Sequence, residues 1–123
     1  MKSRDSALKA KRFDVAERTR KVASLEGTIR DFELMASDLS RQIASEEDRT
    51  GIRDAAHFAY STFAKAAALR RANLLISVAD LKMQLGAARR DYEEAAQALK
   101  RLEPAEERDR LHGKGDPRAV AGG

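Results

Sequence analysis

Residues 74–85 read LLISVADLKMQL, and the spacing of apolar residues in this stretch decides the fold. The apolar residues recur at alternating steps of four and three: Leu74, Val78, Leu81 and Leu85. That is the spacing of the a and d positions of a coiled coil. The same rhythm extends back to Tyr60 and forward to Leu102. A 3.5-residue period of this length predicts a left-handed supercoil rather than one face of a globule.

A second run with the same period occupies residues 8–46. It is well formed from Val22 to Ile43 and weaker before Val22, where Lys11 and Arg18 occupy apolar positions. Such misfits, Arg71 among them, either reach the surface along their apolar stems or mark a loosely zipped open end that is available to a partner. Together the runs predict a structural seam of Val22, Leu25, Ile29, Phe32, Leu39, Ile43, Leu74, Val78, Leu81, Leu85 and Leu99.

A turn is predicted between the two runs. Gly51 suits the left-handed position that ends a helix, and Asp54 suits the N-cap of the next one. Ser3 is expected to cap the first helix. A short connection makes two long helices antiparallel neighbours. We therefore predict an all-α fold, a long antiparallel two-helix coiled-coil hairpin over residues 3–112, with helix 1 at about 4–50, a turn at 51–54 and helix 2 at about 55–112.

The end of the chain carries helix-breaking residues. Pro104 predicts either a break in the second helix or the first position of a short continuation. Residues 113–123 are rich in Gly and are predicted to be a disordered tail.

Charge alternates in blocks that support the hairpin. The net charge is +5 over residues 1–21, −5 over 26–48, +5 over 65–90 and −4 over 91–109. If residues whose numbers sum to about 110 lie at the same level, each basic block faces an acidic one. The same register pairs apolar with apolar, as in Phe32 with Val78 and Ile29 with Leu81. Charges and apolar layers therefore select one antiparallel register, and the charges disfavour the others.

The composition predicts no catalytic chemistry. Charged residues make up 36% of the 123 residues and aromatic residues 5%, and there is no Cys, which excludes disulfides and thiol chemistry. Its two His have no neighbouring ligands, so we expect no metal, no cofactor, no small-molecule substrate and no enzymatic activity. The compensating acidic blocks disfavour nucleic acid as a partner. Without an apolar span or leader, the protein is expected to be soluble and cytoplasmic.

Half of the aromatic residues lie just after the predicted turn: Phe58, Tyr60 and Phe63. On a helix they would occupy more of the circumference than one seam covers, so some would remain exposed. They are either a contact site at the tip or a plug that closes the end of the hairpin. Leu75 and Ile76 follow the seam residue Leu74 and are more apolar residues than one seam can bury. They indicate a second contact, with a partner or another copy.

Several segments resemble the flagellar export protein family FliJ, of the alphaproteobacterial type. The resemblance covers roughly residues 1–103, and its most specific part is Gly51 to Tyr60, which contains HFAY at residues 57–60. Other matching segments are MKSRDS at residues 1–6, KRF at 11–13, DFE at 31–33, AKAA at 64–67 and ADL at 79–81. The resemblance implies a two-helix coiled coil in the type III export apparatus, similar to the central stalk of rotary ATPases.

The resemblance also implies partners. The open end would insert into the ring of the export ATPase FliI, while the middle and the aromatic tip would contact the export gate protein FlhA. Export chaperones are a further implied partner, and the protein would associate peripherally with the inner membrane at the flagellar base. Our candidates for ring contact are the charged open-end residues Lys9, Lys11, Arg12, Arg18, Arg89 and Arg90. The alternative is a self-associating structural scaffold without an export role, packed through Leu75 and Ile76.

Overall fold

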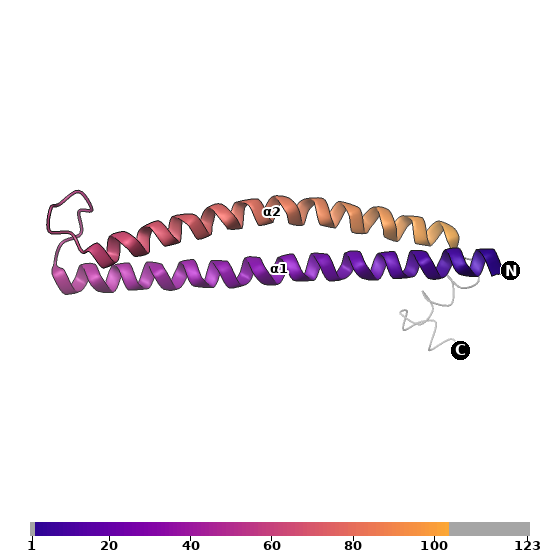
Figure 1. Ribbon diagram of the computed structural model, residues 1–123, viewed down its shortest axis with the longest axis horizontal. Helices are drawn as coiled ribbons and strands as arrows, with labels where there is room; N and C mark the ends of the chain where they lie inside the picture. Colours follow the sequence, from indigo (N-terminus) through magenta and orange to yellow (C-terminus); the bar gives the residue numbers. More distant parts are fainter. Residues whose placement is uncertain (1, 104–123) are drawn as a thin grey trace, which may run out of the picture. The chain divides into compact units, whose positions relative to one another are not determined.

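The computed structural model describes residues 2–103 as two long helices joined by a loop (Figure 1). Helix α1 spans Lys2–Thr50 and helix α2 spans Thr62–Leu102. The described part of the chain is all-helical and contains no strand. The chain divides into two compact units, one made of Ala23–Ala87 and the other of the residues up to Val22 with those from Ala88 onward.

Burial follows the heptad pattern. Every apolar residue of the described chain that is buried belongs to one of the two runs found in the sequence, because only these positions face the neighbouring helix within a unit. The predicted seam residues are all buried or half-buried, as the pattern requires. The buried residues are Leu8, Ile29, Ala36, Leu39, Ala64, Ala67, Val78, Leu85, Ala88 and Ala95.

In the Ala23–Ala87 unit the end of α1 and the start of α2 lie side by side and antiparallel (Figure 1). Arg71 Nε donates a hydrogen bond to Ser40 Oγ at 2.7 Å. Lys82 Nζ lies 3.4 Å from Glu33 Oε2. The Arg71–Ser40 contact agrees with the predicted register to within one residue, and the Lys82–Glu33 contact to within about a turn and a half. They also confirm that Arg71, a misfit in the apolar seam, reaches the exposed surface and finds a polar partner there.

In the other unit Leu8, Ala88 and Ala95 are buried. The misfit residues Lys11 and Arg18 both bind Asp14, which lies three residues after the first and four before the second. The Lys11 Nζ–Asp14 Oδ2 distance is 3.3 Å. One acidic side chain on the same helix therefore holds both basic side chains that interrupt the apolar run.

The connection between the helices is longer than predicted. Helix α2 begins at Thr62 rather than near residue 55, so the connection spans residues 51–61 and not 51–54. At its start Gly51 has a φ of 75°, and its N–H donates to the carbonyl of Glu47 at 2.8 Å. This is the hydrogen bond of a left-handed C-cap, so the predicted role of Gly51 is confirmed.

The residue that caps α2 is Ser61, and the prediction of Asp54 as the cap is wrong. Ser61 Oγ accepts a hydrogen bond from the N–H of Ala64 at 3.1 Å, which satisfies a donor of the first helical turn. Asp54 Oδ1 instead accepts from the N–H of Ala56 at 2.9 Å, which makes a local turn within the loop. The Asp54 side chain therefore binds a backbone N–H two residues later, which favours a turn over a helical conformation at this point.

The ends of the helical region also differ from the sequence-based boundaries. Helix α1 begins at Lys2, so Ser3 lies inside the helix instead of capping it. Asp5 lies in the first turn, where a negative charge is favourable. The predictions for Pro104, for the continuation of helix 2 to residue 112 and for a disordered tail at 113–123 fall outside the described residues.

Gly27 and Gly51 should respond to alanine in opposite ways. Gly51→Ala should lower the free energy of unfolding by about 1 kcal/mol, because a Cβ disfavours a positive φ even where it meets no atom within 4 Å. Gly27→Ala, inside α1, should raise it by up to about 1 kcal/mol. Its Cβ would meet Arg30 at 3.8 Å, an ordinary contact. Urea unfolding followed by circular dichroism measures both, and equal signs would contradict the capping role of Gly51.

Candidate partner-binding surfaces

The loop between the helices presents an aromatic tip. The side chain of Phe58 is 96% exposed. Its ring stacks on that of His57, with centroids 4.7 Å apart and an angle of 23° between the planes. His57 Nδ1 accepts a hydrogen bond from the N–H of Ala59 at 3.0 Å, which fixes the imidazole that supports Phe58. A large apolar side chain is thus held in solvent on an ordered turn, which is typical of a contact residue.

The loop is tied to the end of α1 by the three consecutive acids Glu46, Glu47 and Asp48. Ser61 Oγ donates to Glu46 Oε1 at 2.9 Å, and the hydroxyl of Tyr60 donates to Glu47 Oε2 at 2.7 Å.

Arg53 completes this set of contacts by binding Asp48. The role of this acidic run depends on where the loop folds back, which the sequence pattern does not show.

These contacts shift the acid–base properties of the residues that hold the loop. The Arg49 guanidinium, followed by the Ser61 hydroxyl, stabilises the Glu46 carboxylate and lowers its pKa from 4.5. The pKa of Tyr60 is raised, first because its hydroxyl donates to Glu47 and that hydrogen bond favours the protonated phenol. Both shifts favour the protonation states that occur near neutral pH, so the anchored loop is the neutral-pH form.

The stabilisation that comes from the Glu46 carboxylate should disappear in acid. Because its pKa is lower in the folded chain than in the unfolded chain, this stabilisation is present above pH 4.5 and is lost as the pH falls through the folded pKa. Wild type should therefore unfold at higher urea concentration than Glu46→Gln at pH 7, and the two midpoints should converge in acid. A gap between the midpoints that stays the same at all pH values would contradict this assignment.

The other predicted contact residues lie on different surfaces. Tyr60 is half-buried and bound to Glu47, whereas Phe63, in the first turn of α2, is 56% exposed. Leu75 and Ile76 are both exposed, but they line separate grooves of the Ala23–Ala87 unit. The structure thus brings Phe58 and Tyr60 together on one loop and separates Leu75 from Ile76.

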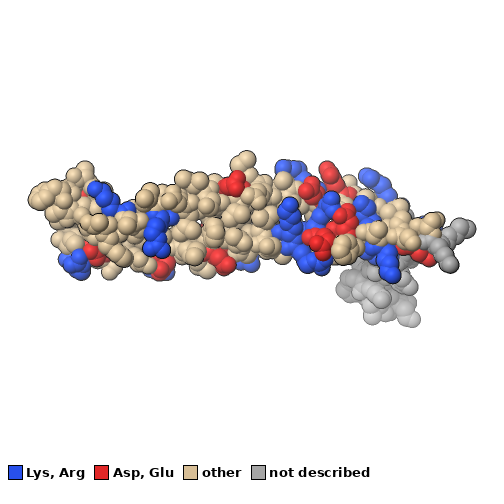
Figure 2. All heavy atoms as spheres, viewed as in Figure 1, with Lys and Arg blue, Asp and Glu red and all other residues tan. Residues whose placement is uncertain are grey.

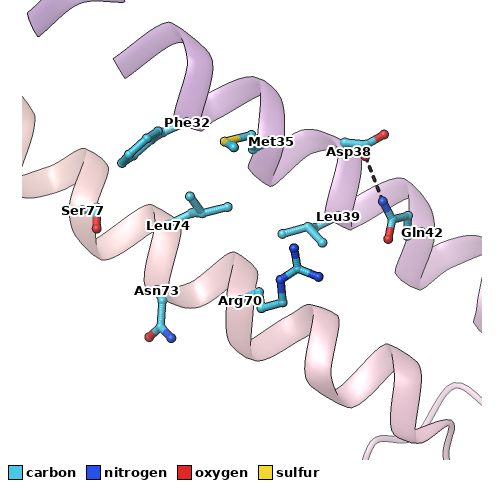
Figure 3. A pocket seen from close by; sticks show the side chains of 9 residues that line it. All are labelled: Phe32, Met35, Asp38, Leu39, Gln42, Arg70, Asn73, Leu74 and Ser77. Atoms are coloured by element: carbon cyan, nitrogen blue, oxygen red, sulfur yellow. Dashed lines mark hydrogen bonds between the residues drawn. The ribbon is translucent and has the colours of Figure 1, made fainter. Parts of the chain in front are cut away.

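The two sides of the Ala23–Ala87 unit differ. We call the side with the Arg71–Ser40 and Lys82–Glu33 contacts the bridged side; Leu75 lines its groove. The opposite side, which we call the groove side, has a hollow of about 480 Å³ (Figure 3). Its walls come from both helices, with an apolar floor and a polar rim. The residues that line it are Phe32, Met35, Asp38, Leu39, Gln42, Arg70, Asn73, Leu74 and Ser77.

Exposed apolar side chains are concentrated in the same unit. On the face in Figure 2, uncharged side chains cover most of the part that holds the loop and the adjoining helix segments, with scattered charged groups between them. Among the large exposed apolar residues within 2–103, only Phe13 and Tyr92 belong to the other unit. Those in the Ala23–Ala87 unit are Leu34, Met35, Phe58, Phe63, Leu69, Leu75, Ile76 and Met83. Two packed helices bury only the residues of the seam between them. This unit also carries many large apolar side chains that lie outside the seam and are exposed.

The basic residues proposed for ring contact all lie in the unit that contains the start of α1 and the end of α2. Lys11 and Arg18 are half-buried and bind Asp14, so their charges are partly compensated within α1. Lys9 and Arg90 are exposed. Arg12 and Arg89 are exposed as well, and each has a polar interaction within the protein.

Two further results concern chemistry and membranes. Within residues 2–103 no cluster of three or more His, Cys, Asp or Glu side chains could hold a metal ion. Neither helix contains, in its described part, a stretch that is long and apolar enough to span a membrane. Comparison with known protein families, curated proteins and solved structures found no match to this chain.

Proposed function

We propose that this protein is a non-enzymatic component of a flagellar type III export apparatus. In this proposal it is a coiled-coil stalk that inserts into the ring of the export ATPase FliI and couples that ring to the export gate protein FlhA. It would work in the cytoplasm, peripherally associated with the inner membrane at the flagellar base, and would also engage export chaperones. The proposal rests on the resemblance of residues 1–103 to the FliJ family, which is most specific from Gly51 to Tyr60.

The observation that best supports the proposal is the exposed Phe58 on an anchored loop. The most family-like segment of the chain is also the one that holds a fully exposed aromatic ring, stacked on His57. Glu47 and Glu46 hold the adjoining Tyr60 and Ser61 against α1. Because the loop is already ordered, the Phe58 ring can bind a partner with little further loss of conformational entropy. A preorganised aromatic residue of this kind suits a protein partner better than a substrate.

The coupling would be mechanical and allosteric. A stalk changes the equilibrium between states of a surrounding ring only if it contacts those states differently. Because acidic and basic blocks alternate along the sequence, the surface charge of the helices changes sign along their length and from one helix to the other. The exposed Lys9 and Arg90 are the residues we assign first to this contact, because the charges of Lys11 and Arg18 already have a partner in Asp14.

ATP hydrolysis by the cognate FliI, with and without this protein, tests the stalk. We expect faster hydrolysis or stronger ring assembly when the protein is added, and a smaller effect with Lys9→Glu/Arg90→Glu. Both side chains are exposed, so the variant should keep its helical content. An unchanged rate and unchanged assembly, at concentrations where binding is demonstrated, would refute the proposal.

Binding to FlhA tests the tip. Phe58→Ala should weaken binding by roughly tenfold or more, the effect expected for an exposed aromatic anchor that becomes buried in an interface. Phe13→Ala is the matched control, because Phe13 is also exposed but belongs to the other unit. If both variants bind FlhA as wild type does, Phe58 makes no contact with FlhA and this part of the proposal is refuted.

A further inference from the structure

The groove side of the Ala23–Ala87 unit exposes apolar surface between its two helices. Phe32 and Leu74 are only half-buried there, and the side chain of Met35 is 53% exposed. A second hollow, which shares Phe32 and Ser77 with the first, extends the groove. The apolar floor thus continues along both helices instead of forming an isolated cavity. An exposed apolar groove between two helices is where a further helix packs in a bundle.

The polar residues on the rim do not bridge the groove. Asp38 accepts a hydrogen bond from Gln42 of its own helix at 2.8 Å (Figure 3). It accepts another from Arg41, also on α1, at 3.1 Å. Asp80 likewise accepts from Gln84 on α2 at 2.8 Å. Arg70 extends from α2 toward α1 but makes no hydrogen bond or ion pair with any residue that the structure describes. One rim therefore carries an uncompensated positive charge.

We infer that a second copy of this chain covers the groove, so that two Ala23–Ala87 units form a four-helix bundle. The two groove sides face each other across a two-fold axis that is parallel to the helices. Helix α1 of each copy then lies beside its own α2 and beside α2 of the second copy. Every pair of neighbouring helices is antiparallel, as in an up-down-up-down bundle.

Charge selects the second copy as the occupant. Residues 26–48 of α1 carry seven acids and two Arg, whereas residues 65–87 of α2 carry four basic residues and one acid. On the groove itself the α1 flank carries Asp38 and the α2 flank carries Arg70 and Asp80, so the occupant must present a positive group to Asp38 and a negative group to Arg70. In the proposed arrangement α2 and α1 of the second copy supply these two groups. Pairing α2 with α2 would instead place like charges together.

The register identifies one specific contact. A two-fold axis parallel to the helices keeps each residue at the same level in both copies. Arg70 and Asp38 line the same groove, and the Arg71–Ser40 contact places their levels within about one helical turn of each other. Arg70 of one copy consequently faces Asp38 of the second copy across the new interface, and symmetry produces this contact twice. The dimer thus gives Arg70 the partner that it lacks in the single chain.

The dimer does not depend on the proposed export function. It uses neither the exposed Phe58 nor the basic open-end residues, and it leaves Leu75 on the bridged side uncovered. Ile76, which lines the groove side, would become covered. If the protein dimerises but does not change ATP hydrolysis by FliI, the dimer stands and the export proposal fails. If a monomer changes ATP hydrolysis by FliI, the reverse holds.

Sedimentation equilibrium of the full chain tests the dimer. We expect a concentration-dependent mass that approaches twice the 13.6 kDa of the chain. Met35→Asp should yield a monomer with unchanged helical content, because this exposed side chain lines the groove. The adjacent Leu34→Asp is the matched control: Leu34 is 69% exposed but does not line the groove, so this variant should still dimerise. A monomer at all concentrations, or equal behaviour of the two variants, would overturn the inference.

A charge exchange tests the predicted contact. Arg70→Asp and Asp38→Arg should each raise the dissociation constant of the dimer about tenfold, because each substitution acts twice in a symmetric dimer. The double variant, Arg70→Asp/Asp38→Arg, should restore most of the affinity, since the opposite charges face each other again. If the double variant is as weak as the product of the two single effects, the copies do not pack in this register.

Discussion

Leu39→Ala is expected to lower the free energy of unfolding by about 3 kcal/mol, which is a large part of the stability of a small protein. Leu39 is 5% exposed, and it packs at the seam between α1 and α2 in the Ala23–Ala87 unit. Its removal costs the transfer energy of the lost methyl groups, and it also leaves a void that two helices cannot close without shifting.

Leu34→Ala is the matched control for this effect. The same chemical change on the same helix, five residues away, removes a side chain that is 69% exposed. We expect it to change the free energy of unfolding by no more than about 0.5 kcal/mol. Urea unfolding of both variants, fitted with a common slope, measures the difference. Equal losses would mean that the surface carrying Leu34 is buried in solution and that the heptad seam does not dominate stability.

The seam was predictable from the sequence because burial between two helices requires apolar residues at a regular heptad spacing. Each a or d residue must be apolar over many turns, so the pattern is read from many positions and single misfits do not erase it. Charge blocks added the register, which the Arg71–Ser40 contact supports. Arg71 itself shows why a misfit is tolerated: its stem packs while its guanidinium reaches the surface.

The loop was predicted poorly because its structure depends on single hydrogen bonds. Asp54 and Ser61 are both good N-caps by composition, and only the backbone turns at Asp54 and His57 decide between them. Glu46 and Glu47 resemble an ordinary charged helix end until the chain returns to bring Tyr60 and Ser61 against them. Local sequence does not record such a contact, because the partners are more than a dozen residues apart.

The groove side was anticipated only in part. The sequence indicated that Leu75 and Ile76 exceed one seam, but it did not show that they lie in different grooves. Consecutive residues on a helix are about 100° apart, which places these two side chains on opposite sides of the seam. Polar contacts such as Lys82–Glu33 then distinguish the two sides. Positions on either side of a seam are equivalent in a heptad pattern, so the asymmetry becomes visible only in three dimensions.

Ile29→Asp should have the largest effect on stability, and that effect should depend on pH. Ile29 is 6% exposed and lies between Glu26 and Glu33, which are three residues before it and four after it on α1. An ionised carboxylate there would be desolvated next to two like charges. We expect a loss of about 4 kcal/mol or more at pH 7, enough to leave a substantial fraction of the protein unfolded.

The sign of the pH dependence follows from the cost of burying the charge. Burial and the neighbouring acids would raise the pKa of the introduced carboxyl in the folded chain above its value in the unfolded chain. Folding then favours the protonated form, so the variant should regain stability as the pH falls toward the unfolded pKa and lose it as the pH rises.

Ile29→Asn separates the charge from the loss of the apolar side chain, because Asn has nearly the same shape as Asp but does not ionise. It should cost less than Asp at pH 7, and its deficit relative to wild type should not change between neutral and acidic pH. The difference between the Asp and Asn variants, measured by urea unfolding across that range, isolates the cost of placing a charge in the seam. If Asp and Asn are equally destabilising at every pH, water reaches Ile29 and the seam is open at this level.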